Sequence, residues 1–359
     1  MHQFKFASML LMAMILASCG GGNSNVPAKP KFSSQVSFGD SLSDVGSYRV
    51  GIGIGTGEFT VNAASGVPTN WTELTAPQFG LAAPCAAETG VDNGSGATPG
   101  TPTGSVIPVA NNAACTGYAQ GGARVTSPIG IGNKALGSGG FFLTVPVATQ
   151  ISNHLTAHGG SFSGNEIVFV MAGANDVFYQ VALVSAGAIT SASAVAAVQT
   201  AATELAADVN NQITGKGAKY VVVMNVPDIG STPQVTSIAN ATVQAQTKAL
   251  FDALVTAFNA TLKASLPDSA NVLNVDAFTA SHDEVANKDK YLLSNVTATA
   301  CNLAVTNNTS FFCTSLNSLT LNTGDVSHYL FADAVHPTPY GHALFAQYVL
   351  QAMTNKGWY

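Results

Sequence analysis

Residues 166–176 read EIVFVMAGAND, a mainly apolar run followed by a polar turn. Similar short runs occur at 35–38 (QVSF), 220–225 (YVVVMN) and 271–275 (NVLNV). Nearly unbroken apolar runs rich in Val and Ile are typical of strands that are buried on both faces of a parallel sheet. The sequence therefore predicts that these four segments form one central sheet.

Longer segments with helical periodicity lie between and after these strands. We expect helices at about 144–158, 190–213, 238–265 and 340–354, and we interpret the Ala-rich stretch 181–207 as part of a core-facing helix rather than a membrane span. Strands that alternate with helices predict an α/β fold, a three-layer α/β/α sandwich with a central, mostly parallel sheet. In such sheets the ligand site lies at the carboxyl ends of the strands.

The composition excludes some functions. The chain has 359 residues, of which 47% are hydrophobic and only 9% are charged, with a formal net charge of −6. Its only arginines are Arg49 and Arg124. Because a run of phosphates must be neutralised by clustered basic side chains, we expect no nucleic-acid binding.

The amino terminus predicts export. An apolar stretch at 7–16 (ASMLLMAMIL) is too short to span a bilayer and is typical of a signal peptide. The next residues, LASCG, resemble a bacterial lipobox ending at Cys19, which would carry lipid; an ordinary signal peptide with a coincidental Cys is the alternative. We therefore expect a signal peptide at 1–18, a flexible tether at 19–32 and one domain at 33–359, lipid-anchored in the cell envelope, at the outer membrane, or secreted.

Four cysteines remain after Cys19. In an oxidising compartment an even number suggests two disulfides, and three pairings are possible. Proximity in sequence favours Cys85–Cys115 and Cys301–Cys313. Since there is no C-x-x-C and no His at ligand spacing, we expect no metal site at these residues.

Polar residues follow two of the predicted strands. Ser41 follows the first strand within FGDSLSD, where a serine can act as a nucleophile or simply cap a helix. Ser43 and Asp44 fit a cap or turn better. Asn175, in GAND, could direct its amide into a pocket above the sheet, although this composition is also common in turns.

A carboxylate and an imidazole lie close together near the end of the chain. Asp333 and His336 precede Thr338 and Pro339, which have the pattern of a helix N-cap and first turn. An Asp three residues from a His can accept its Nδ1–H and leave Nε2 to take a proton from a serine. This D-x-x-H pair is weak evidence by itself. The other histidines have no comparable setting, and we interpret His342 as a packing or surface residue.

Together these pieces resemble the GDSL or SGNH hydrolase family, in particular its secreted bacterial esterases and lipases. Gly39-Asp40-Ser41-Leu42 matches the nucleophile motif, the Gly121 region within YAQGGARV matches the oxyanion glycine motif, Gly173-Ala174-Asn175-Asp176 matches the oxyanion asparagine motif, and Asp333-x-x-His336 matches the acid and base. The resemblance implies a flavodoxin-like fold.

The resemblance also implies a mechanism. Ser41 would attack a carboxylic ester, His336 would act as base, and Asp333 would orient it. The oxyanion would be bound by the backbone N–H groups of Ser41 and Gly121, with Gly122 as the alternative glycine, and by the Asn175 amide. This chemistry needs no cofactor and no metal.

Other functions remain open at this point. A phospholipase or acyltransferase, a carbohydrate acetylesterase, and a catalytically inert surface lipoprotein that binds a ligand are the alternatives. The expected partners are a small-molecule or lipid ester and, through the anchor, a membrane. We expect a monomer.

Overall fold

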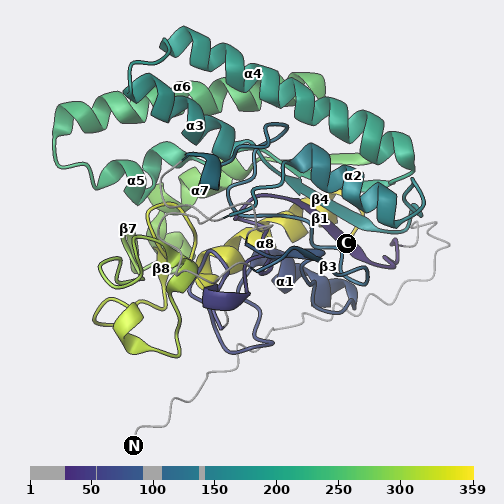
Figure 1. Cartoon of the computed structure of the whole chain (residues 1–359), viewed down its shortest axis with the longest axis horizontal. Helices are drawn as coiled ribbons and strands as arrows, with labels where there is room; N and C mark the ends of the chain where they lie inside the picture. The colour runs from purple at the N-terminus through teal and green to yellow at the C-terminus, as the bar shows by residue number, and fades with distance from the viewer. Residues whose placement is uncertain (1–28, 54, 92–106, 137–141) are drawn as a thin grey trace, which may run out of the picture.

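A computed structural model describes residues 29–53, 55–91, 107–136 and 142–359 (Figure 1). The predicted signal peptide, Cys19 and most of the predicted tether lie outside these residues.

A sheet of four parallel strands, in the order β1-β4-β5-β6, forms the centre of the fold. Its strands are β1 (Gln35–Gly39), β4 (Ile167–Met171), β5 (Tyr220–Met224) and β6 (Val272–Val275). These are the four segments that the sequence predicted. The register aligns Gly39 with Met171 and Met171 with Met224, so the strands end at a common edge.

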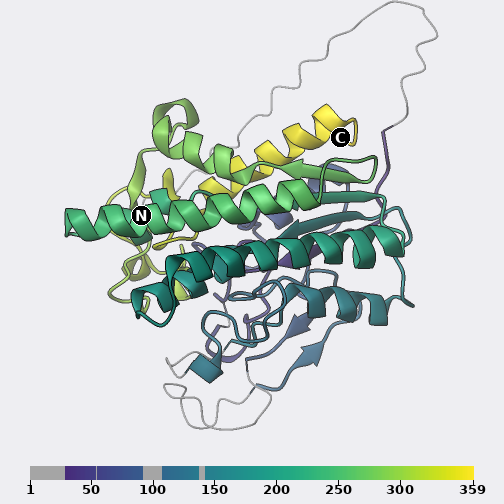
Figure 2. The same ribbon diagram turned by 90° about the horizontal axis from the view of Figure 1, so that it is seen from above.

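Helices cover both faces of this sheet, which makes the fold a three-layer α/β/α sandwich (Figures 1 and 2). The eight described α-helices are α1 (Trp71–Thr75), α2 (Val147–Ala157), α3 (Ala174–Ser185), α4 (Ser191–Asp208), α5 (Pro233–Thr236), α6 (Ala241–Ser265), α7 (Ala277–Ala286) and α8 (Pro339–Lys356). Among the described helices, none is both long enough and apolar enough to cross a membrane.

Alternate side chains of each strand enter opposite halves of the core. Val168 and Val170 of β4 pack with apolar residues of α2, α3, α4 and α6. Ile167, Phe169 and Met171 of the same strand pack with residues of α1, α7 and α8. Because both faces are covered, these strands have few polar residues, which explains the apolar runs in the sequence.

Four of the described helices, α1, α3, α5 and α7, lie outside the expected ranges. α3 was not predicted because the residues before it have turn composition. Gly173 precedes α3 with a φ of 110°, which lets the chain turn directly from β4 into the helix. The expected continuous helix from 181 is also wrong, since α3 ends at Ser185 and Gly187 has a φ of 68° before α4 begins.

Smaller elements flank the sandwich. β2 (Glu88–Thr89) and β3 (Ala110–Asn111) are antiparallel, and β7 (Asn295–Thr299) and β8 (Tyr329–Phe331) are parallel. Both pairs of cysteines that proximity favoured are bonded, Cys85 to Cys115 and Cys301 to Cys313. β8 leads directly into the segment that contains Asp333.

Candidate active site

Ser41 lies just beyond β1, at the edge where the parallel strands end. The last residue of β1, Gly39, is held by Gln150 of α2, whose side chain accepts from the Gly39 N–H at 2.9 Å and donates to the Gly39 carbonyl at 2.8 Å. A Cβ at Gly39 would lie 2.4 Å from the Met171 carbonyl oxygen, so only glycine fits so close to β4. The serine is thereby fixed relative to the sheet.

The structure brings Ser41, His336 and Asp333 together. The Ser41 Oγ lies 2.9 Å from His336 Nε2, and His336 Nδ1 lies 2.9 and 2.8 Å from the two carboxylate oxygens of Asp333. As expected, Thr338 caps α8 and Pro339 begins it, so the 333–336 loop leads directly into this helix. Ser41 and His336 are 295 residues apart in sequence.

Asp333 is buried and well supplied with donors. Its carboxylate accepts hydrogen bonds from the backbone N–H groups of Ser310, Val335 and His336. Burial acts to raise the pKa of Asp333, but the His336 ring and the donors from Ser310 and Val335 outweigh it and hold the pKa well below its ordinary value. The carboxylate therefore stays ionised, as a group that orients an imidazole must.

Asn175 lies at the start of α3 and lines the same cavity as Ser41. One proton of its amide is donated to the Ala123 carbonyl at 3.0 Å, and within the described residues the other has no acceptor. The backbone N–H of Ser41 likewise has no acceptor in the described part of the chain. Both donors are available to a group bound in the cavity.

The glycine segment differs from the expectation. The N–H of Gly121 donates to Asp44 Oδ2 at 2.8 Å, so it is not free to bind an oxyanion. Gly122 lines the cavity instead, and its N–H has no acceptor among the described residues. The φ of Gly122 is 81°, and a Cβ there would lie 2.0 Å from the Ile131 carbonyl oxygen, so this position requires glycine. Gly122 therefore replaces Gly121 as the candidate donor.

The cavity in front of Ser41 has a volume of about 430 Å³. Its lining includes the aromatic rings of Phe59, Phe142 and Phe178. Among the described lining residues, only Asp40 and His336 can ionise, and none is basic apart from that histidine. The cavity therefore suits an uncharged, partly apolar molecule.

These features agree with one protein family. The family model described as GDSL-like Lipase/Acylhydrolase matches residues 36–349. The chain belongs to this GDSL-like family. Membership in this family supports a hydrolase.

Solved structures and curated proteins add little to the assignment of this GDSL-like hydrolase. An alpha/beta hydrolase from the metagenome of Lake Arreo, Spain, is 15% identical in sequence to this chain. The match covers 91% of this chain and 96% of the other, with a TM-score of 0.41. A variant of an acetyl xylan esterase from Geobacillus stearothermophilus is 13% identical, covers 90% and 95%, and has a TM-score of 0.37. Among curated proteins, none matches the chain.

Two carboxylates of the GDSL-like hydrolase lie near Ser41 without joining the Ser-His-Asp arrangement. Asp44 accepts from the N–H groups of Gly46, Ser47 and Gly121, as a turn residue that also holds the glycine segment. Burial raises its pKa to about 6. Burial also raises the pKa of Asp40 to about 7, against the lowering effect of the Leu42 N–H. No group of the described residues hydrogen-bonds to Asp40 Oδ2.

Asp176 and Arg124 form a largely buried ion pair. Arg124 Nε lies 2.9 Å from Asp176 Oδ1, and the two side chains are 13% and 4% exposed. The other oxygen of Asp176 accepts from the Val125 N–H at 3.0 Å. The pair thus joins the segment after Gly122 to α3, which carries Asn175.

Sequence reasoning missed three contributors to the site. Gln150 was visible only as a polar residue on the inner face of a predicted helix, and Phe59, whose ring centroid lies 5.1 Å from that of His336, falls in a loop. The Ser310 N–H gives no sequence signal, since it is a backbone group. Among the described residues, no cluster of three or more His, Cys, Asp or Glu side chains is placed to hold a metal ion.

Among the described histidines, those other than His336 make no hydrogen bond to Ser41. His342 is buried in α8, as a packing residue, and burial together with the nearby His336 lowers its pKa to about 3. His154 is also buried, against Phe38 and Phe162.

Proposed function

We propose that this chain is a serine esterase that hydrolyses carboxylic esters through an acyl-enzyme on Ser41. His336 Nε2 removes the Ser41 proton as Oγ attacks the ester carbonyl, and it returns this proton to the leaving alcohol. Water then attacks the acyl-enzyme with His336 as base, which releases the acid and restores Ser41. Asp333 keeps the imidazole oriented and stabilises its charged form.

The observation that carries this proposal is the unbroken chain of contacts from Ser41 Oγ through His336 to a buried, ionised Asp333. The N–H groups of Ser41 and Gly122 and the free amide proton of Asn175 would bind the oxyanion. A binding protein without catalytic activity would need neither this series of contacts nor these hydrogen-bond donors, which is why we prefer an enzyme.

The test is steady-state hydrolysis of p-nitrophenyl butyrate by Ser41→Ala. We expect a loss of activity of at least about 10³-fold, because the nucleophile is gone. Ser43→Ala, two residues along the chain, is the matched control and should keep its rate. The Ser43 hydroxyl accepts from Trp71 and, among the described residues, makes no hydrogen bond to Ser41, His336 or Asp333. Undiminished activity in Ser41→Ala would contradict the proposal.

We propose further that the substrate is an uncharged ester with a short or medium acyl chain. The cavity volume of about 430 Å³ lies at the lower end of the range for small-molecule pockets, roughly 300–1,000 Å³. No Lys or Arg is present among its described lining residues to pair with a phosphate. Rates on p-nitrophenyl esters should therefore fall from butyrate to palmitate and be low on phospholipid. Preference for acetylated sugars or phospholipid would instead identify one of the alternative activities.

The place of action rests on the sequence alone. From the lipobox-like LASCG we propose that Cys19 is lipidated and anchors the enzyme in the cell envelope. Mass spectrometry of the amino-terminal peptide from the wild type and from Cys19→Ser tests this. A lipid mass on Cys19 in the wild type is expected, and an unmodified peptide cut elsewhere would overturn it.

A further inference from the structure

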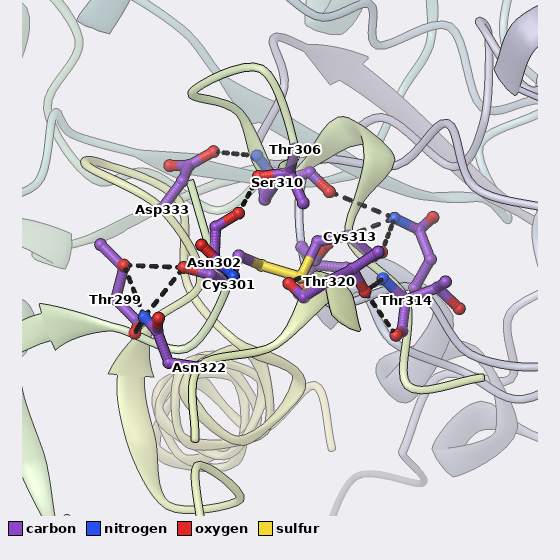
Figure 3. The surroundings of a disulfide bond; sticks show 12 residues. Thr299, Cys301, Asn302, Thr306, Ser310, Cys313, Thr314, Thr320, Asn322 and Asp333 are labelled. Carbon is purple, nitrogen blue, oxygen red and sulfur yellow. Dashed lines mark hydrogen bonds between the residues drawn. A yellow bond between two sulfur atoms is a disulfide. The ribbon is translucent and has the colours of Figure 1, made fainter. Parts of the chain in front are cut away.

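The Cys301–Cys313 disulfide lies beside Asp333 (Figure 3). It closes a loop with a sequence separation of 12, and this loop contains Ser310. The Ser310 N–H donates to Asp333 Oδ2 at 2.7 Å. The other described donors to this carboxylate, in Val335 and His336, belong to the same loop as Asp333 itself. Among the described residues, Ser310 is thus the one donor that holds the carboxylate from a separate segment.

The disulfide joins the two segments that hold Asp333. On one side, the Cys301 N–H donates to the carbonyl of Ala332, the residue directly before Asp333, at 2.9 Å. On the other side, the Cys313 N–H donates to the Ser310 carbonyl, also at 2.9 Å. The S–S bond therefore closes a ring of contacts that runs from the Asp333 backbone to the Asp333 carboxylate.

Apolar side chains pack around the two sulfurs. The buried cluster around the two sulfurs consists of small or medium side chains, namely Val61, Ala300, Cys301, Cys313 and Ala332. Within the loop, Ala304, Val305, Asn307 and Asn308 are exposed, and Asn307 and Asn308 have positive φ values of 54° and 59°. Ser310 is also restrained by its neighbour Phe311, which is buried with Tyr48 and Phe59, and by the Asn62 amide, which donates to the Cys313 carbonyl. The disulfide adds the covalent link between this segment and Cys301.

The same loop also supports the imidazole. The ring of Phe311 has its centroid 5.6 Å from that of Phe59, and the Phe59 centroid lies 5.1 Å from that of His336. Thr309 lines the cavity in front of Ser41. A shift of this loop would therefore change the positions of both Asp333 and His336.

We propose that the Cys301–Cys313 disulfide is a positioning element of the active site, which holds the Ser310 N–H against Asp333 and so fixes Asp333 for His336. The inference rests on the proposed function, because it matters for catalysis only if Asp333 orients His336. A disulfide that merely stabilised the fold would affect unfolding but not the rate of the folded enzyme.

The first test compares two disulfide deletions. In Cys301→Ala/Cys313→Ala we expect kcat to fall by up to about 10²-fold, the cost of a small misplacement, with KM nearly unchanged. The matched control is Cys85→Ala/Cys115→Ala, since no hydrogen bond in the described part of the chain joins either cysteine to Ser41, His336 or Asp333. It should lower the melting temperature and leave kcat as in the wild type. Rates are measured on protein shown by circular dichroism to be folded.

The second test asks whether the effect passes through Asp333. We combine the Cys301→Ala/Cys313→Ala change with Asp333→Asn and measure kcat for all four members of the cycle. If the disulfide acts by positioning Asp333, its removal causes no further loss in the Asp333→Asn enzyme. Losses that multiply would show a general structural role and overturn the inference.

A third variant covers the case in which the cysteine variant does not fold. Ser310→Pro removes the N–H at the first residue of a 3₁₀ helix, and Thr309 before it has a φ of −141° and a ψ of 147°, which a residue preceding proline adopts readily. Ser318→Pro, at the first residue of another 3₁₀ helix, is its control. We expect a fall in kcat only in Ser310→Pro, and equal rates in both would overturn the inference. Full activity in Asp333→Asn would instead refute the proposed function.

Discussion

Asn175 has one amide proton committed to the protein and one available to substrate. The hydrogen bond to the Ala123 carbonyl fixes the orientation of the amide, so the free proton is already in place before any ester binds. Such preorganised donors lower the barrier because they need no rearrangement as the oxyanion forms. The geometry makes Asn175 the residue in which binding of the oxyanion can be separated from proton transfer.

For Asn175→Ala we expect a folded enzyme with kcat lower by about 10²–10³-fold, the usual cost of removing one oxyanion donor. The measurement is kcat and KM on p-nitrophenyl butyrate, with Asn210→Ala, an exposed residue at the end of the α4 region, as the control. A kcat equal to that of Asn210→Ala would remove Asn175 from the oxyanion site.

Single residues also show where sequence reasoning stops. Ser41, Asp333 and His336 could be proposed because each lies in a motif with its own chemistry. Gly121 could not be distinguished from Gly122, because the acceptor that occupies the Gly121 N–H, Asp44, lies 77 residues away in sequence. Backbone N–H donors such as that of Ser310 cannot be recognised from the sequence, because every residue except proline has one.

At the scale of elements, the four strands of the sheet were predictable because burial on both faces demands apolar side chains. The cap of α8 was predictable as well, since Thr338 and Pro339 have local roles. The start of α3 was not, because its residues also suit a turn. Only packing decides there: the Phe258 ring lies against Gly173 and leaves no room for a side chain.

Gly173→Ala should therefore destabilise the protein and displace Asn175. A Cβ at Gly173 would lie 2.2 Å from Phe258 and would also have to accept a φ of 110°, at a combined cost of about 2–5 kcal/mol. Gly187→Ala is the matched control, since its φ is 68° but nothing lies within 4 Å of the new Cβ. It should cost only about 1–2 kcal/mol and leave kcat unchanged. Urea unfolding gives both free energies, and equal values would contradict the role of Phe258.

The whole molecule buries several carboxylates whose pKa values are raised. Burial, with the charge of Asp283, raises the pKa of Glu284 to about 8, and burial raises the pKa values of Asp40 and Glu58 to about 7. Between pH 6.5 and 8.5 the folded chain therefore binds more protons than the unfolded chain at these sites, so stability falls as the pH rises. Burial lowers the pKa values of His154 and His342, which has the opposite effect, but only below about pH 6.5.

Glu284→Gln tests this pH dependence at the carboxylate with the highest of these pKa values. Its amide needs no proton to stay neutral, so the fall in unfolding free energy from pH 6.5 to 8.5 should shrink by on the order of 1–2 kcal/mol. Asp289→Asn, at an exposed position, is the control and should keep the wild-type pH dependence. An unchanged slope in Glu284→Gln would show that Glu284 is ionised throughout this range.

The central claim is that Ser41 is the nucleophile and that His336 activates it. A fluorophosphonate probe tests it directly, because the probe bonds to an activated serine and the modified peptide can be located by mass spectrometry. The account predicts one label per folded molecule, on Ser41, with labelling abolished in Ser41→Ala and strongly slowed in His336→Ala. A label on another serine, or undiminished labelling in Ser41→Ala, would contradict it.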